Sequence, residues 1–205
     1  MSPRPRQASD AEILMAAFRA IARIGPARVT LADVARDAGL TAAAVVQRFG
    51  SKRALLLAAA ADAAAGHTYI FEGVRRAHRS PLAALLGLAD CMTILGASAD
   101  AVTHTLAFFQ LDLNDAGFRA HASAGARHFE AGIRALLDDA VQARELRKCD
   151  TARLAHALHA TLNGSILDWA IRREGPMAAR VRRDLQTVLD PYIRRSRRAT
   201  TASAG

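Results

Sequence analysis

Apolar residues recur along this chain at the three- and four-residue spacing of a helix, and Gly, Pro and capping residues interrupt the pattern at intervals. In the first such segment Leu14, Phe18 and Ile21 share one face before the Gly25-Pro26 pair ends it. Ala, Leu and Arg, which form helices readily, are abundant, whereas β-branched residues are sparse. The chain is therefore predicted to be all-α, and its composition argues against an all-β or a parallel α/β fold.

These interruptions predict about nine helices in two domains. The helices are expected at residues 11–24, 31–38, 42–49, 51–79, 81–96 and 98–114, then onward to about 145, from 150 or 151 to 173, and at 176–193. Residues 9–55 would form a small helix-turn-helix domain and residues 56–195 a larger helical domain. A disordered arm (1–8) and a disordered basic tail (196–205) would flank them. Gly117, Gly125 and Gly132 are expected to weaken the helix that ends near residue 145.

The net charge of +9 is unevenly distributed along the chain. Residues 1–55 carry nine basic and four acidic residues, residues 56–171 carry ten and twelve, and residues 172–205 carry nine and three. A basic front segment indicates a polyanionic partner, with nucleic acid as the first candidate. A solvated surface in an Arg-rich protein would give the same count.

Several classes of protein are disfavoured. No apolar run approaches the ~20 residues of a membrane span, and the start of the chain lacks the apolar segment of a secretory signal, so no membrane partner is expected. Cys91 and Cys149 are too few for a disulfide scaffold, which favours a reducing cytoplasm. Basic neighbours slightly favour a reactive thiolate at Cys149, but a buried or incidental thiol is expected at both positions. The sequence has no Gly-rich phosphate loop, nucleophile elbow or metal-ligand cluster, so neither an enzyme nor a cofactor is expected.

The stretch from Val29 to Leu57 is the most informative about function. It contains two short helical segments joined through Gly39, each preceded by a threonine, Thr30 or Thr41, that suits an N-cap. The outer face of the second segment offers short side chains and one amide, at Ala42, Ala43, Val46 and Gln47. Such short side chains let a helix backbone lie deep in the major groove of DNA.

This stretch resembles the DNA-binding domain of the tetracycline-repressor (TetR) family of bacterial transcription regulators. The resemblance rests on an opening helix, ILMAAFRAIARIG, followed by VTLADVARDAGL and TAAAVVQRFGSKRALL, of which FGSK is the most diagnostic part. By motif it covers roughly a quarter of the chain, and by length and helix count nearly all of it. It implies a homodimeric repressor, or an activator, that binds a palindromic operator in double-stranded DNA. A small-molecule effector would bind in the divergent helical domain.

The resemblance also assigns roles to single residues. The family usually has an aromatic residue, often Tyr, that touches a phosphate where this chain has Val46. The His often found two positions later is Arg48, which is expected to restore a phosphate contact. Lys52, beside the free N–H groups of a helix N-terminus, is expected to clamp a phosphate, with a solvated lysine as the alternative. Gln47 would read adenine, contact a phosphate, or contact nothing.

Four further residues have a second role beside a structural one. Thr30 and Thr41 are helix caps first, and they become phosphate donors if the caps face the DNA backbone. Arg4 and Arg6 would enter an adjacent minor groove as an arm, or remain a solvated tail without DNA.

Aromatic side chains and isolated polar groups share helical spacing in the larger domain, and this mixture suits an effector pocket between helices. The candidates are His104, Phe108, Phe109, Asp112, Asn163 and Trp169. Residues 56–171 are nearly neutral and contain no basic cluster, so we expect an apolar or aromatic effector rather than a nucleotide. The alternative for each candidate is an ordinary place in the core or on the surface.

The last two helices, 151–173 and 176–193, are amphipathic and are predicted to form a twofold four-helix dimer interface. Their apolar stripes are Leu154, Leu158, Leu162, Leu185, Val188 and Leu189. His156 and His159, three residues apart, have metal-pair spacing. Without a clear Cys or carboxylate partner nearby, they are expected to be surface or interface histidines.

Two functions remain open on the sequence. In the first, an effector favours a state with more widely spaced recognition helices than the ~34–36 Å between successive major grooves, and so releases the DNA. The long helix that starts at Ser51 would link effector and DNA. The second is a helical ligand-binding or interaction module with weak or vestigial DNA binding.

Overall fold

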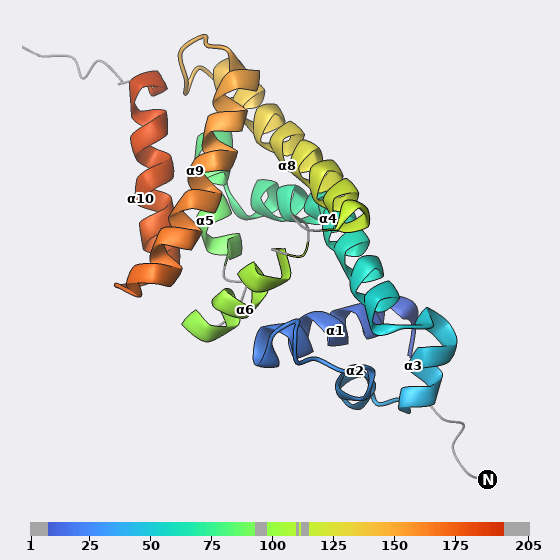
Figure 1. Ribbon diagram of the computed structural model, residues 1–205. Coiled ribbons are helices and arrows are strands. Elements are labelled where there is room, and N and C mark those ends of the chain that lie inside the picture. Colours follow the sequence, from blue (N-terminus) through green and yellow to red (C-terminus); the bar gives the residue numbers. More distant parts are fainter. Residues whose placement is uncertain (1–7, 93–97, 110, 112–114, 195–205) are drawn as a thin grey trace, which may run out of the picture.

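In the computed structural model, nine α-helices make up most of the described part of the chain, which comprises residues 8–92, 98–109, 111 and 115–194 (Figure 1). They are α1 (Asp10–Ile24), α2 (Leu31–Ala38), α3 (Ala42–Phe49), α4 (Lys52–Ala77), α5 (Pro81–Cys91), α6 (Ala99–Phe109), α8 (Ala116–Gln142), α9 (Thr151–Arg172) and α10 (Met177–Leu189). A 3₁₀ turn, η2 (Asp190–Tyr192), follows α10, and an isolated antiparallel bridge joins Leu146 to Ile193. The described residues form no β-strand. The prediction of an all-α fold is confirmed.

Short-range hydrogen bonds fix where the first helices begin. At α1, the Ser9 hydroxyl accepts the Glu12 N–H at 3.2 Å, and the Glu12 carboxylate accepts the Ser9 N–H at 2.8 Å. At α2, the Thr30 hydroxyl accepts the Asp33 N–H at 3.2 Å, and the Asp33 carboxylate accepts the Thr30 N–H at 3.0 Å. Both pairs are capping boxes, which satisfy amides that a helix start leaves free.

Helices α1–α3 form the small domain at the lower end of the molecule, and α4 leads from it into the larger domain (Figure 1). There α4 lies along α8, and α9 packs against α8 on one side and α10 on the other. Helix α5 contacts α4, α8 and α10, whereas α6 contacts α1 and α9. Helix α6 is therefore positioned between the two domains.

Helix α8 continues through all three glycines that were expected to weaken it. All three face α4. A Cβ atom added at Gly125 would lie 3.2 Å from the Cβ of Ala64, and one added at Gly132 would overlap the ring of Phe71. The missing side chains let the two long helices approach closely, and this packing outweighs the poor helix propensity of glycine.

Two apolar cores hold the fold together, and α4 contributes to both. The smaller core joins α1–α3 to Leu55, Leu56 and Ala59 at the start of α4, and it also includes Phe108 of α6 and Phe118 of α8. The larger core lies among α4, α5, α8, α9 and α10. A domain division at residue 55 therefore falls inside one continuous helix.

The element boundaries differ from the predicted ones mainly around α5 and α6. Helix α5 ends at Cys91 rather than near residue 96, and α6 spans Ala99–Phe109 where 98–114 was expected. Residues 93–97, 110 and 112–114 lie outside the described part, as do 1–7 and 195–205, which contain most of the predicted arm and tail. Ala8, assigned to the arm, is buried in the smaller core.

Helix α4 is long and apolar enough, by length and composition alone, to cross a membrane. In the fold it packs against α1, α5 and α8.

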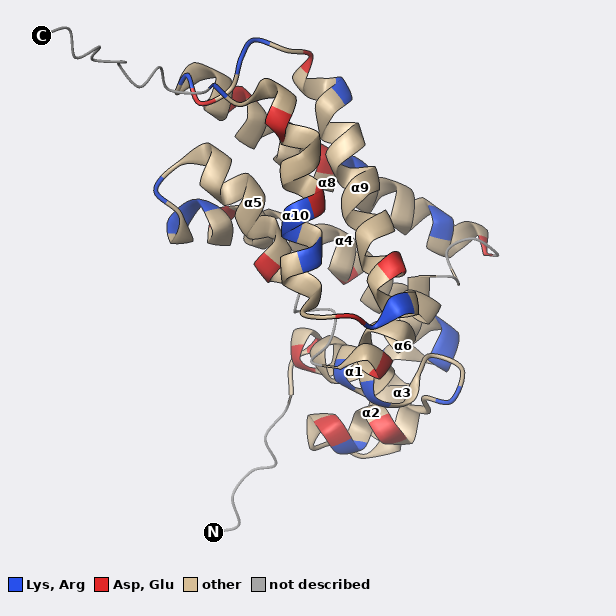
Figure 2. Ribbon diagram, turned by 90° about the vertical axis from the view of Figure 1, so that its left-hand side faces the viewer, with Lys and Arg blue, Asp and Glu red and all other residues tan. Residues whose placement is uncertain are grey.

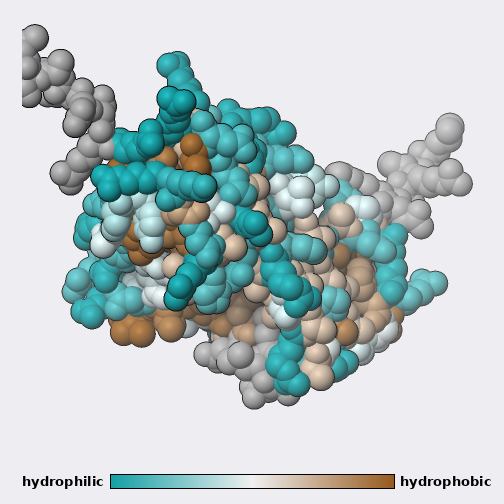
Figure 3. Space-filling view, turned by 90° about the horizontal axis from the view of Figure 1, so that it is seen from above, coloured by the Kyte–Doolittle hydropathy of each residue, from teal (hydrophilic) through white to brown (hydrophobic). Residues whose placement is uncertain are grey.

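Figure 3 shows apolar patches among hydrophilic side chains on the face seen from above. The exposed large apolar residues are Met15, Val46, Tyr69, Phe109, Leu167 and Ile171.

Candidate functional site

Helices α2 and α3 form a helix-turn-helix. The chain leaves α2 at Gly39, whose φ of 68° and ψ of 31° are left-handed and favour glycine. Val34 and Ala35 of α2 and Val45 of α3 are buried in the smaller core against α1. Burial of these three residues fixes which face of α3 points outward.

The outward face of α3 carries small side chains and one amide. The exposed residues of α3 and its cap are Thr41, Ala42, Ala43, Val46, Gln47 and Arg48, and Val46 is 45% exposed. These include Ala42, Ala43, Val46 and Gln47, which were predicted to lie on the outer face of this helix. The helix thus presents a smooth surface on which Gln47 has the longest uncharged polar side chain.

Thr30 and Thr41 both act as caps. The Thr41 hydroxyl accepts the Ala44 N–H at 3.2 Å. The Thr30 hydroxyl accepts the Asp33 N–H and donates to the Asp33 carboxylate at 2.6 Å. These bonds from Thr30, with a smaller contribution from Arg36, lower the pKa of Asp33. Both threonines lie at the surface, so a cap and a DNA contact are compatible.

The side chains of Arg48 and Lys52 bend back onto the small domain. A guanidinium nitrogen of Arg48 donates to the carbonyl oxygen of Ala8 and lies 3.5 Å from the Asp10 carboxylate. The Lys52 ammonium donates to the Ala27 carbonyl oxygen at 2.8 Å, in the turn between α1 and α2. The Lys52 Nζ atom is therefore held at the turn between α1 and α2.

Helices α1 and α2 carry both acidic and basic residues, whereas α3 carries Arg48 and no acidic residue (Figure 2). The ion pairs are Arg23–Asp37 at 2.6 Å and Arg36–Asp33 at 3.0 Å. Arg53, in the first turn of α4, pairs with Asp115 at the start of α8 at 2.7 Å, and this bond lowers the pKa of Asp115. The acids of residues 1–55 are already counted in the net charge of that segment, so of these pairs only Arg53–Asp115 offsets its basic excess.

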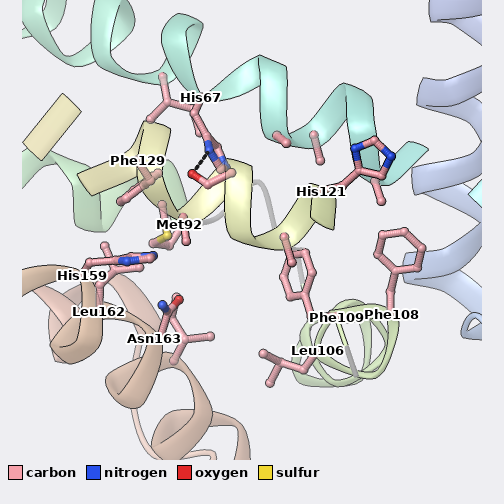
Figure 4. Close-up of a pocket in the computed structure, with 18 of the residues that line it drawn as sticks. His67, Met92, Leu106, Phe108, Phe109, His121, Phe129, His159, Leu162 and Asn163 are labelled. Atoms are coloured by element: carbon pink, nitrogen blue, oxygen red, sulfur yellow. Dashed lines mark hydrogen bonds between the residues drawn. The ribbon is translucent and has the colours of Figure 1, made fainter. Parts of the chain in front are cut away.

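A cavity of about 640 Å³ lies in the larger domain among α4, α6, α8 and α9 (Figure 4). Its walls are mostly alanine, leucine and aromatic side chains. The polar side chains in its lining are His67, His121, His159 and Asn163. This volume and composition match those of small-molecule sites in proteins.

Three of the six predicted effector residues, Phe108, Phe109 and Asn163, line this cavity. His104 and Trp169 do not. His104 Nδ1 lies 2.9 Å from the Ala22 carbonyl oxygen of α1, and the Trp169 indole donates to the Gly175 carbonyl oxygen at 2.9 Å. Asp112 lies outside the described residues.

Three histidines line the cavity, His67, His121 and His159, and none of them was among the predicted effector residues. His67 Nδ1 lies 3.0 Å from the Gly125 carbonyl oxygen, and its ring meets that of Phe129 edge-on, with centroids 5.1 Å apart. Burial is the main cause that lowers the pKa of His67. The bond to Gly125 raises it, and His159 and His128 lower it further. The signal in the sequence is weak, because His67 lies in an alanine-rich segment without a motif.

The expectation that His156 and His159 lack a carboxylate partner is wrong. Glu130 of α8 reaches both, with its Oε1 atom 2.9 Å from His156 Nδ1 and 3.2 Å from His159 Nδ1. These bonds lower the pKa of Glu130. The partner comes from a different helix, which is why spacing along α9 gave no sign of it. Within the described residues no group of three or more potential ligands could hold a metal ion.

Aromatic side chains connect the cavity to the small domain. Phe108 of α6 is 1% exposed; it lines the cavity and lies edge-on to Phe18 of α1, with ring centroids 6.1 Å apart. On its other side it meets Phe118 of α8, edge-on at 6.3 Å. A ligand that displaces α6 would therefore press directly on the core that holds the helix-turn-helix.

The apolar stripes assigned to a dimer interface belong to the protomer's own core. The six residues of these stripes are Leu154, Leu158, Leu162, Leu185, Val188 and Leu189. Five of them are buried, and Val188 packs against the same core. That assignment is wrong, because α10 uses its apolar face to pack on α9 and α5. The free face of α9 carries a different row, Ala157, Ala160, Gly164, Leu167 and Ile171. Leu167 and Ile171 are 53% and 73% exposed.

Both cysteine thiols are free and half-buried. Burial raises the pKa of Cys91, and Asp90 adds to this. Burial also raises the pKa of Cys149, with smaller contributions from Asp150 and Asp138. The acidic neighbours of Cys149 in space outweigh its basic neighbours in sequence, which disfavours a reactive thiolate.

Residues 13–59 match the profile of the bacterial regulatory proteins of the tetR family. No curated protein matches the chain by sequence. A TetR transcription regulator from Haloarcula marismortui superposes with a TM-score of 0.73 at 17% identity, over 90% of this chain and 98% of that one. SmeT, the repressor of the Stenotrophomonas maltophilia multidrug efflux pump SmeDEF, gives a TM-score of 0.65 at 21% identity, over 93% of each chain. FadR from Bacillus subtilis, solved with stearoyl-CoA, gives 0.69 at 14% identity, over 88% and 98%.

Proposed function

Since the chain belongs to the TetR family of transcription regulators, we propose that it is a homodimeric repressor that a small apolar or aromatic effector releases from a palindromic operator. It would act in the cytoplasm on double-stranded DNA. The observation that carries the proposal is the outward face of α3, which combines small side chains with Gln47 next to the start of α4.

The DNA contacts follow from the exposure of α3 and the N-terminus of α4. Ala42, Ala43 and Val46 are short enough for the α3 backbone to lie close to base edges, where Gln47 would read adenine or contact a phosphate. Lys52 stands at the N-terminus of a 26-residue helix, where free N–H groups and the helix dipole favour a phosphate. Thr30, Thr41 and Arg48 would add contacts to the DNA backbone.

The free face of α9 supports a homodimer. Ala157, Ala160, Gly164, Leu167 and Ile171 recur every three or four residues and form one row along the helix. Space around Gly164 is open, so a second α9 can approach the backbone there. Twofold pairing would bury Leu167 and Ile171, the most exposed apolar side chains of α9.

Effector response would pass from the cavity to the small domain through α6. Phe108 and Phe109 line the cavity, and Phe108 also contacts Phe18 of α1. An effector that binds more tightly to a state with displaced α6 would increase the population of that state. In it, the distance between the two recognition helices of the dimer would no longer fit two successive major grooves. The loss of DNA affinity equals the effector's differential binding free energy.

The test begins with selection of bound sequences from random duplex DNA by the full-length protein. Affinity for the selected duplex is then measured by fluorescence anisotropy over a range of salt concentrations. Lys52→Ala should weaken binding to all sequences and lower the salt slope by about 1 per protomer. Lys148→Ala is the matched control, because Lys148 is the only other lysine and lies in the exposed α8–α9 loop.

Gln47→Ala separates base reading from backbone contact. If Gln47 reads a base, the variant loses preference at one position of the selected sequence by about 1–3 kcal/mol while other positions are unchanged. Failure to enrich any sequence, together with a protein that binds apolar ligands, would favour the alternative of a helical ligand-binding module with vestigial DNA binding.

A further inference from the structure

We propose that the cavity takes an aromatic ligand bearing a phenolic hydroxyl, and that His67 Nε2 accepts the hydrogen bond of that hydroxyl. This inference rests on the proposed function, because it names the chemistry of the effector for the same cavity. It is carried by the fixed orientation of the imidazole rings in the cavity wall (Figure 4).

The contact with Gly125 fixes the tautomer of His67. A carbonyl oxygen can only accept, so the Nδ1 atom 3.0 Å from it must carry the proton. Burial lowers the pKa of His67, so the ring is neutral near pH 7 and Nε2 keeps its lone pair. No group in the described part of the chain hydrogen-bonds to Nε2, and the ring lines the cavity. His67 thus offers the cavity an acceptor.

His159 presents the same kind of group from the opposite side of Phe129, as Figure 4 shows. Its Nδ1 donates to the Glu130 carboxylate at 3.2 Å, and its ring lies against Phe129 with centroids 5.3 Å apart. This bond leaves Nε2 as the ring nitrogen of His159 that a ligand in the cavity can reach. Both imidazoles lie against Phe129 at one end of the cavity, so a ligand hydroxyl bonded to His67 would also lie near His159.

An anionic ligand fits this lining poorly. No Lys or Arg is found among the described residues of the cavity wall, and Asn163 is the one side-chain amide there. A carboxylate would face the lone pair of the neutral His67 imidazole, without a Lys or Arg side chain to offset its desolvation. A neutral hydroxyl avoids both costs.

The remainder of the wall favours an aromatic body. Phe108, Phe109 and Phe129 present ring faces and edges to the cavity, and Met92 and Leu162 close it with apolar surface. Aromatic pairs gain from edge-to-face contact beyond simple burial. A phenol is also a stronger donor than an aliphatic alcohol, so one molecule satisfies both parts of the site.

The experiment compares three probes of one shape: 2-naphthol, 2-methoxynaphthalene and 2-naphthoate. Their affinities for the full-length protein are measured by isothermal titration calorimetry at near-neutral pH. We expect 2-naphthol to bind about tenfold more tightly than its methyl ether, because the ether lacks the proton that Nε2 accepts. We expect 2-naphthoate to bind more weakly than 2-naphthol.

Variants at His67 locate the acceptor. In His67→Asn the amide N–H replaces the bond to Gly125 but no acceptor occupies the Nε2 position, so the naphthol-to-ether preference should fall to about one. His67→Gln places an amide near Nε2 and should restore part of the preference. Tyr69→Phe is the control, because Tyr69 is exposed on α4, two residues from His67, and does not line the cavity. A ratio of affinities within one variant is insensitive to partial loss of folded protein.

The hydroxyl inference is overturned if wild type shows no preference for naphthol, if His67→Asn keeps the preference, if naphthoate binds best, or if no probe binds. DNA binding is measured on the same preparations without any probe. If the protein binds its operator, and the ether releases it from the DNA as readily as naphthol does, the proposed function stands and the hydroxyl inference fails. Absence of operator binding in every preparation would contradict the proposed function instead.

Discussion

The approach of α4 to α8 forms one side of the cavity, and Gly132 gives a direct test of how that approach is set. A Cβ atom at this position would lie 2.6 Å from Cζ of Phe71 and closer still to two other ring atoms. The Phe71 ring is buried and packs edge-on against Phe129 with centroids 5.0 Å apart, so it has little room to move. Gly132→Ala should therefore overpack the contact.

Two effects of opposite sign set the magnitude. Replacing a helical glycine by alanine gains about 1 kcal/mol of helix stability. Overpacking a filled core costs about 1–3 kcal/mol. With the midpoint of this cost and the gain in helix propensity, Gly132→Ala should lower the free energy of unfolding by about 1 kcal/mol. For a chain of this size, this corresponds to a fall in Tm of about 2–4 °C.

Gly73→Ala is the matched control within α4. No atom lies within 4 Å of a Cβ added there, so only the propensity gain remains and the protein should be stabilised. Thermal melts followed by circular dichroism measure both variants. A double-mutant cycle of Gly132→Ala with Phe71→Leu should show a favourable coupling of at least about 1 kcal/mol, because the smaller side chain makes room for the new methyl group. If Gly132→Ala stabilises the protein as much as Gly73→Ala, the glycine does not set the distance between the helices.

Three further outcomes are expected. Phe108→Ala should cost about 3–5 kcal/mol in chemical denaturation, because it empties a fully buried site in the small-domain core, and it should raise the effector concentration needed to release DNA. Because the pKa of His67 is lowered in the folded state from an ordinary value near 6.5, its contribution to stability is complete above that pH and is lost as pH falls below it. The drop in Tm on mild acidification should accordingly be smaller in His67→Phe, and an unchanged drop would contradict the assignment. Alkylation of Cys91 and Cys149 by iodoacetamide at neutral pH should be slower than that of free cysteine, as judged by intact mass, since burial raises both pKa values.

The sequence alone determined the starts of the helices and the helix-turn-helix. Caps at Thr30, Thr41, Ser51 and Ser80 bond to amides three residues along the chain, so they depend on nothing distant. The outward face of α3 was predictable for a related reason. Its eight residues pack on one small core, so apolar spacing identifies both the buried and the free side.

Tertiary structure decided what the larger domain does with its apolar and polar residues. The stripe containing Leu185 and Leu189 looks equally suited to a partner subunit, and only the positions of α5 and α9 show that the protomer buries it. Residues of four helices form most of the cavity wall. His67 and His159 line it, whereas His104, which was predicted to line it, contacts α1 instead. Periodicity gives the face of one helix, but which neighbour covers that face depends on contacts between residues far apart in the chain.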